Sequence, residues 1–514
     1  MRPWLSAAVA LALGCSAEVR APAADRGITV LIESPIDSLD SRFALSAAGQ
    51  RVSQLITPGL ITFDAAAEPI PDLAESFQWV DERTMTFKLR ENLRFHDGSS
   101  LTSRDVEETY SGLLDPRLGS PRGAKLEAVL SVRALDPRTV QVTLKRPFAP
   151  ALADLSIGIV PARLAYLPAA QEQERHPQGA GPFRFVRREE PESVVLEPHP
   201  GYYGGAPRIS RLVIRTVRDE TTRLLELLKG RADLVVNALA PANMKVVEDA
   251  PGLSLQRVAG TGFSYLGFNL RAGPTADLRV RRALCAALDV PQLARFKFRG
   301  LAEPATGMLP RGTWAYAATP GCRRDLSLAG RLLDEAGFPD PDGPGGRPRL
   351  TLSYKTSTDR LRRSMAVVLQ KQAAEAGIAL EIRALEFGTF FSDVRHGNFE
   401  VMSLKWVTVM EPDLLRGVFH SSQVPTEQNY WGGWNRGGYS NPRLDGILEE
   451  ASRVDRPRRQ ALYAQAQRIL DQELPYLPLW HEQSVCVVSR RLAEYRCSTH
   501  GFLTPLAQAR EVGR

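Results

Sequence analysis

His96 and Asp97 stand side by side and are followed by four hydroxyl side chains in the segment GSSLTS. A histidine oriented by an aspartate could act as general base for a serine or threonine nucleophile. Neighbouring residues of an extended strand, however, point to opposite faces, so the pair is not aimed at one nucleophile. Gly98 suits a turn after Asp97, and Thr102 with Asp105 matches a T-x-x-D variant of the helix capping box. We therefore predict a strand, a turn and a capped helix here, without catalytic function.

The motifs of common enzymes and metal sites are absent from the sequence. It contains no GxSxG, no phosphate-binding loop with GK[ST] and no HExxH. The segment WHEQS, residues 480–484, lacks a second histidine four residues after the first. None of the seven histidines is paired at positions i and i+4, the spacing that places two ligands on one helix face. We predict no catalytic residue, no cofactor and no resident metal.

The N-terminus, MRPWLSAAVALALGCS, has one early positive charge, a mostly apolar run at residues 4–13 and then Gly14 and Cys15. The run is shorter than the roughly 20 apolar residues of a membrane-spanning helix and is typical of an export signal. We expect residues 1–14 to be a signal peptide. The cysteine after ALG resembles a bacterial lipobox, although Ala12 stands where that motif prefers Leu or Val. This resemblance implies lipidation of Cys15 and a tether over residues 15–27; an ordinary signal peptide is the alternative.

Four further cysteines lie in the body of the chain, and none has CxxC spacing, which argues against a zinc ribbon or a redox motif. Export exposes the chain to an oxidising compartment, where Cys486 and Cys497 could close a hairpin. Such a bridge would stabilise the fold by about 3 kcal/mol, and both the bridged and the reduced state stay open. Cys285 lies on the apolar face of a predicted helix and is expected to be a buried free thiol.

The length of 514 residues predicts two to four lobes at roughly 150 residues each. A hydrophobic content of 43% is ordinary for a folded protein. The formal charge of +7 comes largely from arginines spread along the chain near acids, so we predict solvated surfaces and no nucleic-acid partner.

The chain up to about residue 180 alternates apolar and polar residues at strand length, as in TMTFKLR and TVQVTL, and predicts antiparallel β-structure. Residues 349–406 change to a strand, a helix and two further strands, which predicts a parallel pair. Ligands of such sheets bind beyond the carboxyl ends of the strands. The segment after Trp406, VTVMEPD, is therefore the first place to look for a ligand site.

Several blocks in order carry a resemblance to a known family. They include PDLAESF, TMTFKLR and FHDGSSLTSRDV, then GAGPFRF, HPGYYGGAPRISRLVIRTV, FNLRAGPTADLRVRRALCAALD and YSNPRLDGILEEA. Over nearly its whole mature length the chain resembles the solute-binding proteins of bacterial ABC importers for dipeptides, oligopeptides and nickel complexes, extracellular family 5.

The resemblance implies an α/β, two-lobed periplasmic-binding-protein (Venus-flytrap) fold with three structural domains and mixed sheets. Lobe I would comprise residues 28–59, 181–262 and 480–514, with a β-rich domain II inserted at 60–180 and lobe II (domain III) at 263–479. It also implies an exported, periplasmic, lipid-anchored monomer. This protein would capture a peptide or peptide-like solute between its lobes and deliver it to the permease subunits of an ABC transporter in the inner membrane.

The resemblance also places the ligand site on the strand SLKW. In peptide-binding members this strand pairs with the peptide backbone, and an aspartate three residues after the tryptophan holds the α-ammonium. Trp406 matches the tryptophan, but Val409 stands in place of the aspartate. Because an unpaired buried ammonium costs several kcal/mol, either Glu411 substitutes or the ligand has no free amine.

The predicted ligand-binding residues come from this strand and loop, from two neighbouring segments and from the other lobe: Lys405, Trp406, Val407, Thr408, Val409, Glu411, Tyr265, Ala47 and Trp434. His420, Trp431 and Tyr439 are weaker candidates, for which structural roles are the alternative. Two alternatives to a peptide transporter remain open, namely a binder of a metal chelate such as a nickel complex, an opine or another solute without an amine, and an exported sensor on the same fold.

Overall fold

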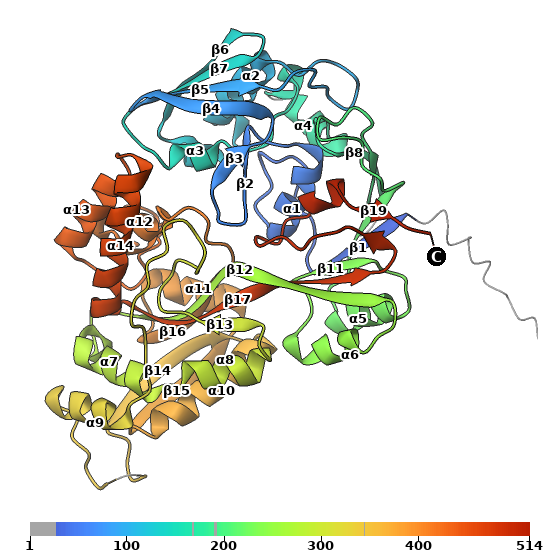
Figure 1. Ribbon diagram of the computed structural model, residues 1–514. Coiled ribbons are helices and arrows are strands. Elements are labelled where there is room, and N and C mark those ends of the chain that lie inside the picture. Colours follow the sequence, from blue (N-terminus) through green and yellow to red (C-terminus); the bar gives the residue numbers. More distant parts are fainter. Residues whose placement is uncertain (1–26, 167–168, 190–192, 344, 514) are drawn as a thin grey trace, which may run out of the picture.

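The computed structural model describes residues 27–166, 169–189, 193–343 and 345–513 (Figure 1). The predicted signal peptide, Cys15 and all of the predicted tether except Gly27 lie outside the described residues. Within the described ranges, no helix combines the length and the apolar character that crossing a membrane requires.

One large mixed sheet runs through the middle of the molecule in the order β15-β14-β16-β12-β17-β11-β1-β10-β9-β8, with β13 paired to β17. Parallel and antiparallel pairs both occur in it, which agrees with the expected mixed α/β class. Its strands are β1 (Ile28–Ile32), β8 (Phe183–Glu189), β9 (Ser193–Pro198), β10 (Leu212–Thr216), β11 (Leu234–Val236), β12 (Leu253–Phe268), β13 (Ala302–Pro304), β14 (Leu350–Ser357), β15 (Ile378–Leu385), β16 (Val401–Trp406) and β17 (Tyr476–Ser489).

Helices lie between many of these strands along the chain. They include α1 (Ala47–Ile56), α7 (Leu278–Ala287), α8 (Val290–Phe298), α9 (Leu326–Glu335), α10 (Arg360–Ala374), α11 (Phe387–His396), α12 (Leu414–Phe419), α13 (Pro442–Ala451) and α14 (Arg456–Glu473).

A second, four-stranded antiparallel sheet lies at the top of Figure 1 and confirms the predicted β-rich region. It consists of β4 (Ala74–Asp81), β5 (Thr84–Leu89), β7 (Thr139–Leu144) and β6 (Val129–Asp136), in that order. The alternation in TVQVTL buries Val140, Val142 and Leu144.

The helix after His96 and Asp97 confirms the turn-and-cap prediction. Gly98 adopts φ +86°, and α2 (Ser103–Leu114) begins after Thr102, whose backbone N–H donates to the Asp105 carboxylate at 2.8 Å. The His96 ring contacts the Gly181 carbonyl at 3.1 Å. This histidine therefore has a structural position between two segments of backbone.

The predicted strand–helix–strand unit is confirmed between residues 349 and 406. β14 and β15 pair in parallel from Leu350 with Ile378 to Ser357 with Leu385, and α10 connects them. Gly377, at φ +78°, provides the left-handed turn between α10 and β15. β16 joins the other side of β14, also in parallel.

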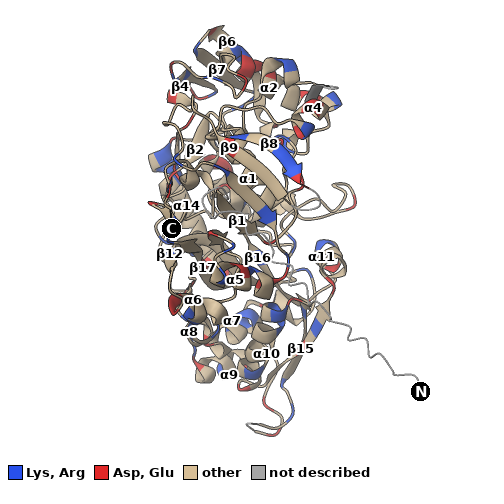
Figure 2. Cartoon of the chain, turned by 90° about the vertical axis from the view of Figure 1, so that its right-hand side faces the viewer, with Lys and Arg blue, Asp and Glu red and all other residues tan. Residues whose placement is uncertain are grey.

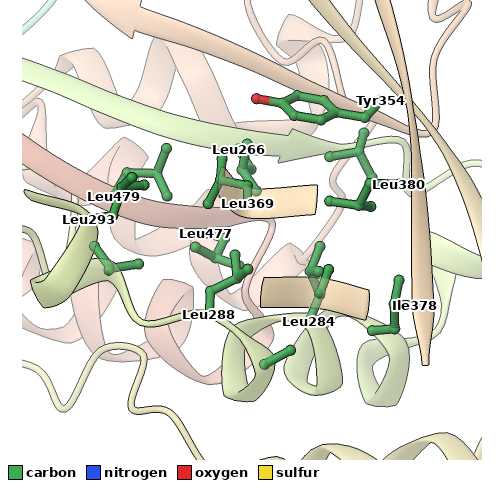
Figure 3. Packing of buried hydrophobic residues seen from close by; sticks show 14 of the residues in the cluster. Leu266, Leu284, Leu288, Leu293, Tyr354, Leu369, Ile378, Leu380, Leu477 and Leu479 are labelled. Atoms are coloured by element: carbon green, nitrogen blue, oxygen red, sulfur yellow. The ribbon is translucent and has the colours of Figure 1, made fainter. Parts of the chain in front are cut away.

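In the lower part of Figure 1, helices pack against the central strands. Figure 3 shows Leu284 of α7 and Leu369 of α10 with Leu266 of β12 and Leu477 of β17, all of them buried. Burial of each such leucine contributes about 1.5–3 kcal/mol. The helices thus hold the central strands, and the strand ends that follow them, in fixed positions.

β12 and β17 are the longest strands and pair along nearly their whole length, from Leu253 with Ser489 to Gly267 with Tyr476. Their register shifts between Val258 and Gly262, a bulge of the kind that bends a strand. A Cβ atom on Gly260 would lie 2.1 Å from the Glu482 carbonyl oxygen. Only glycine permits this close approach of the two backbones at the bend.

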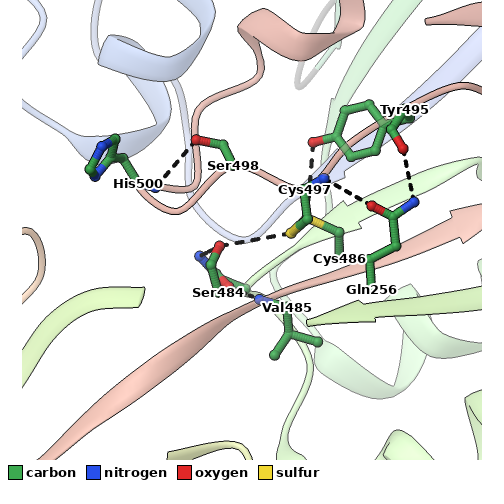
Figure 4. The surroundings of a disulfide bond; sticks show 9 residues. Gln256, Ser484, Val485, Cys486, Tyr495, Cys497, Ser498 and His500 are labelled. Carbon is green, nitrogen blue, oxygen red and sulfur yellow. Dashed lines mark hydrogen bonds between the residues drawn. A yellow bond between two sulfur atoms is a disulfide. The ribbon is translucent and has the colours of Figure 1, made fainter. Parts of the chain in front are cut away.

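Two disulfide bonds form in the described chain. Cys486 and Cys497 are bonded, so of the two states left open by the sequence the structure has the bridged one (Figure 4). Cys285 is bonded to Cys322, so the prediction of a free thiol is wrong. The loop that follows β13 returns to α7, where Asp325 N–H donates to the Ala286 carbonyl at 2.8 Å, and this return brings the two sulfurs together.

Basic and acidic residues are interspersed over the face seen in Figure 2. Many of the arginines form surface ion pairs, such as Arg184 with Glu197 and Arg187 with Glu189. This agrees with the solvated surface predicted from the charge pattern.

Candidate ligand-binding site

β16 has a complete strand partner on one side only. It pairs with β12 from Phe268 with Val401 to Phe263 with Trp406. On the β14 side, the pairing covers only Val401 and Met402. In the described part of the chain, residues 403–406 therefore have no strand partner on that side. Ser403 still contacts β14 through a hydroxyl bond to Thr356 at 3.0 Å, and its carbonyl accepts from Arg362. Alternate N–H and C=O groups of a strand point to each side, so the edge beyond Ser403 can pair with an extended ligand.

Trp406 ends this strand beside two other side chains that a ligand can contact. Its ring centroid is 5.6 Å from that of Trp434, which is 44% exposed. The Cζ atom of Arg436 lies 5.5 Å from the Trp406 ring centroid. The buried Trp406 Nε1 has no hydrogen-bonding partner among the described residues. Such an unpaired donor costs about 1–3 kcal/mol, which a ligand acceptor would offset.

The predicted residues next to Trp406 have different surroundings. Lys405 forms an ion pair with Glu482 at 2.5 Å, Val407 is 61% exposed, and Thr408 is partly buried. The structure thus brings Lys405, Trp406, Val407, Thr408 and Trp434 together around one strand end.

Three other predicted residues are less accessible or more distant. The Val409 side chain is buried in a core with Leu415, and its N–H donates to the Thr261 carbonyl at 3.0 Å. Tyr265 is 1% exposed and stacks on Tyr476 with centroids 4.0 Å apart. Ala47 is the exposed first residue of α1, in a different part of the chain.

Glu411 already has a cationic partner. Its carboxylate pairs with the guanidinium of Arg459, which is 7% exposed, and also accepts the Asp413 N–H at 3.2 Å. The idea that Glu411 replaces the missing aspartate would require an ammonium group to compete with a buried guanidinium.

A charged cluster around Glu411 connects residues 60–180 with residues 263–479. Asp413 pairs with Arg416 at 3.1 Å, and the charges of Glu411 and Asp413 act on Asp154. Burial raises the pKa of both Asp154 and Asp413 to about 7, although nearby cations oppose the shift. These charged groups are largely shielded from bulk water, and pairing between charges matters more in such surroundings than in water.

Direct bonds join the same two parts of the chain around this cluster. Ala149 N–H donates to the Ser452 carbonyl at 2.8 Å, and Arg456 pairs with Glu68 at 2.7 Å. The four-stranded domain is therefore in contact with the part of the chain that carries β16.

The weaker candidates have protein partners. The His420 ring accepts the Ser422 N–H at 3.1 Å and contacts Glu449 at 3.4 Å. The Trp431 ring makes a tilted contact with the His396 ring, with centroids 4.6 Å apart, and the Tyr439 hydroxyl donates to Glu473 at 2.6 Å. These contacts agree with the structural alternative for all three.

Sequence reasoning missed two arginines close to β16. Arg362 of α10 donates from Nη1 to the Ser403 carbonyl at 3.4 Å. Arg436 lies over both Trp406 and Phe391, 4.8 Å from the Phe391 centroid. Arg436 follows the predicted contact Trp434 by two residues, whereas Arg362 lies on a helix for which no ligand contact was predicted. Arginines are frequent throughout the chain, so the residue type alone distinguished neither.

Two pockets lie elsewhere on the same framework. One is lined by residues that include Gly260, Pro304, Tyr316 and His481. The other is lined by residues that include Phe263, Leu415 and Tyr476. Neither contains Trp406, and we favour the strand edge because it offers backbone groups and polar side chains at the carboxyl end of β16. No cluster of three metal-ligating side chains occurs among the residues that the structure describes.

Known proteins resemble this chain over most of its length. The model of the bacterial extracellular solute-binding proteins, family 5, matches residues 68–423. The glutathione-binding protein GsiB of Shigella boydii is 28% identical over 506 residues, covering 95% of this chain and 96% of that protein. GsiB of Pectobacterium atrosepticum is 29% identical over 517 residues, covering 96% and 95%.

Solved structures show the same architecture. NikZ from Campylobacter jejuni, in complex with Ni(L-His), has 25% identity and a TM-score of 0.79 and covers 94% of this chain and 99% of its own. CtaP from Listeria monocytogenes has 22% identity and a TM-score of 0.83 and covers 95% and 99%. The two-lobed architecture of these proteins is therefore the fold of this chain.

Proposed function

Because this chain belongs to the bacterial extracellular solute-binding proteins, family 5, we propose that it captures a short peptide or peptide-like solute between its lobes for delivery to an ABC permease. Members of this family are binding proteins, which confirms the expectation that the chain is not an enzyme. The open edge of β16, residues 403–406, carries the proposal. A peptide supplies the backbone groups that such an edge pairs with.

The proposed lobes follow the division expected from the sequence, with lobe I at 28–59, 181–262 and 480–514, domain II at 60–180 and lobe II at 263–479. Three of the hydrophobic cores support this division. The buried members of the first come entirely from residues 60–180, within domain II. Those of the second come from 28–56, 183–236 and 486–509, within lobe I, and those of the third from 263–476, within lobe II. The bend at Gly260 in β12 is then the natural hinge, because β12 and β17 pair through both lobes.

A solute without a free amine is the second candidate. The apolar, buried Val409 and the engaged carboxylate of Glu411 favour it, because neither leaves an anionic partner for an ammonium group in this loop. The metal-chelate and opine alternatives belong to this class, and the sensor alternative shares the same site.

Glutathione and unmodified tripeptides are expected to raise the thermal midpoint of the purified mature chain. Free ligand at about 100 times Kd adds about 2.7 kcal/mol to the free energy of unfolding. The thermal-shift measurements should also include N-acetylated tripeptides and nickel–histidine, which represent the second candidate class of solute. Trp406→Ala should remove the shift, whereas Trp79→Ala, a change at a partly exposed tryptophan of β4, should retain it. Stabilisation by the acetylated or nickel ligands alone would contradict the peptide proposal and support the second candidate.

We also propose that the chain is a periplasmic lipoprotein anchored through Cys15 and acts as a monomer. When the full-length wild-type chain is expressed in a bacterial host, we expect to find it in the membrane fraction, because acylation supplies the membrane affinity. Detergent should release it. Cys15→Ser should move it to the soluble fraction, and Ser16→Ala should not. A wild-type chain that is already soluble would refute the anchor.

A further inference from the structure

Two guanidinium groups from separate elements converge on the open edge of β16. Arg362 enters from the first turn of α10 and reaches the Ser403 carbonyl at 3.4 Å. Arg436 enters from the loop before α13 and lies over Trp406. The charges of both arginines also act on the buried hydroxyl of Tyr265. Tyr265 pairs in the sheet with Leu404, the residue after Ser403. Positive charge is thus concentrated at the same four residues that lack a strand partner.

These two arginines have no carboxylate partner among the described residues, in contrast to the neighbouring cations. Lys355 pairs with Asp393 at 2.7 Å, and Lys405 pairs with Glu482 at 2.5 Å. The buried Nε of Arg436 has no hydrogen-bonding partner either in the described part of the chain. The fold therefore pairs the lysines of this region with carboxylates and leaves the two guanidinium groups without an anionic partner, while Arg362 donates one hydrogen bond to the Ser403 carbonyl.

Aromatic rings hold Arg436 in place. Its Cζ atom is 4.8 Å from the Phe391 centroid and 5.5 Å from that of Trp406. The partly exposed Trp434 ring lies tilted against Trp406, with the two centroids 5.6 Å apart. Ring faces attract a guanidinium and lower the local dielectric constant, so an anion bound here interacts more strongly than in water. The unpaired Trp406 Nε1 adds a neutral donor next to this cation.

We propose that Arg362 and Arg436 form a carboxylate subsite, which binds an anionic end of the solute whose backbone lies along residues 403–406. A planar guanidinium presents paired donors that match the two oxygens of a carboxylate. The proposal deepens the peptide-binding function and rests on it for the identity of the solute. It makes the carboxylate, and not the amine, the charged group by which this site selects its ligand.

The test compares four probes by calorimetric titration: the tripeptide Ala-Leu-Ala, its C-terminal amide, its N-acetyl derivative and glutathione, of which only the amide lacks a carboxylate. The wild-type chain is expected to bind the free acid about 30-fold more tightly than the amide, the size of a charge-assisted hydrogen-bonded pair. Arg436→Gln and Arg362→Gln should each lower the affinity for the free-acid tripeptide by at least about tenfold and leave the affinity for the amide nearly unchanged. Arg436→Lys should recover part of the loss, because it restores charge without the fork.

Arg363→Gln is the matched control, because Arg363 follows Arg362 on α10 and is exposed. A merely structural role for Arg436 predicts that its variants weaken acid and amide equally, and that result would overturn the proposal. Equal affinities for acid and amide in the wild-type chain, or no binding of any carboxylate probe, would overturn it as well. Binding of the N-acetyl acid alone, with the same dependence on the arginines, would support the subsite while refuting a free-amine peptide as the solute.

Discussion

Replacing Arg459 by methionine is expected to lower the free energy of unfolding by about 3–5 kcal/mol, the cost of breaking a buried ion pair from one side. Arg459 is 7% exposed and pairs with Glu411. Its Nε donates to the Ala451 carbonyl at 3.2 Å, and its guanidinium lies 5.2 Å from the Trp314 ring centroid. Methionine fills much of the same volume but leaves Glu411 without its cation.

The adjacent arginine provides the control for this experiment. Arg458 pairs with Glu450 at 2.7 Å, but its side chain is 54% exposed, so Arg458→Met should change stability by less than about 1 kcal/mol. Urea unfolding of both variants at pH 8, followed by far-UV circular dichroism, measures the difference. Equal losses for the two variants would show that burial does not determine the strength of the Glu411 pair.

The elements that could be predicted from the sequence are those whose cause is local. The capped helix after Thr102, the turn at Gly98 and the strand–helix–strand unit of β14, α10 and β15 depend on residues close together in the chain. The bridge between Cys486 and Cys497 belongs here too, since it closes over a sequence separation of 11.

Long-range contacts could not be predicted in the same way. Cys322 reaches Cys285 only because the loop after β13 returns to α7. The pairing of Arg459 with Glu411 joins α14 to the loop after β16, across 48 positions. Each of these residues has many possible partners in the sequence, and the tertiary fold selects one.

The candidate site likewise has a part that could be predicted from local sequence and a part that depends on long-range contacts. The strand end at Trp406 could be located from the pattern and the family resemblance, because strand geometry alone fixes its backbone groups. The chemistry beside it could not, since Arg362 and Arg436 arrive from two other elements. The aspartate expected from the family resemblance is absent at Val409, and the two arginines beside the strand have no carboxylate partner among the described residues.

Lowering the pH from 8 to 5 is expected to strengthen the contact between residues 60–180 and residues 263–479. Burial raises the pKa of Asp154 and Asp413 to about 7 from an ordinary value of 3.8. The native state therefore binds more protons than the unfolded state between about pH 4 and 7. Stability is then greatest below that window and is lost as the pH rises through 7.

Two shifts of this size correspond to several kcal/mol at most, and mutual coupling of the two acids reduces the expected loss between pH 5 and 8 to about 2 kcal/mol. Urea unfolding of the wild-type chain and of the Asp154→Asn, Asp413→Asn double variant at several pH values isolates this effect, because other titrating groups contribute equally to both. The variant should be the more stable protein at pH 8 and should show a smaller loss of stability between pH 5 and 8. The Asp115→Asn variant is the control, since Asp115 lies at the end of α2 beside the exposed Arg117. Parallel pH profiles for the wild-type chain and the double variant would contradict the assignment, because the pH dependence would then arise from groups outside this cluster.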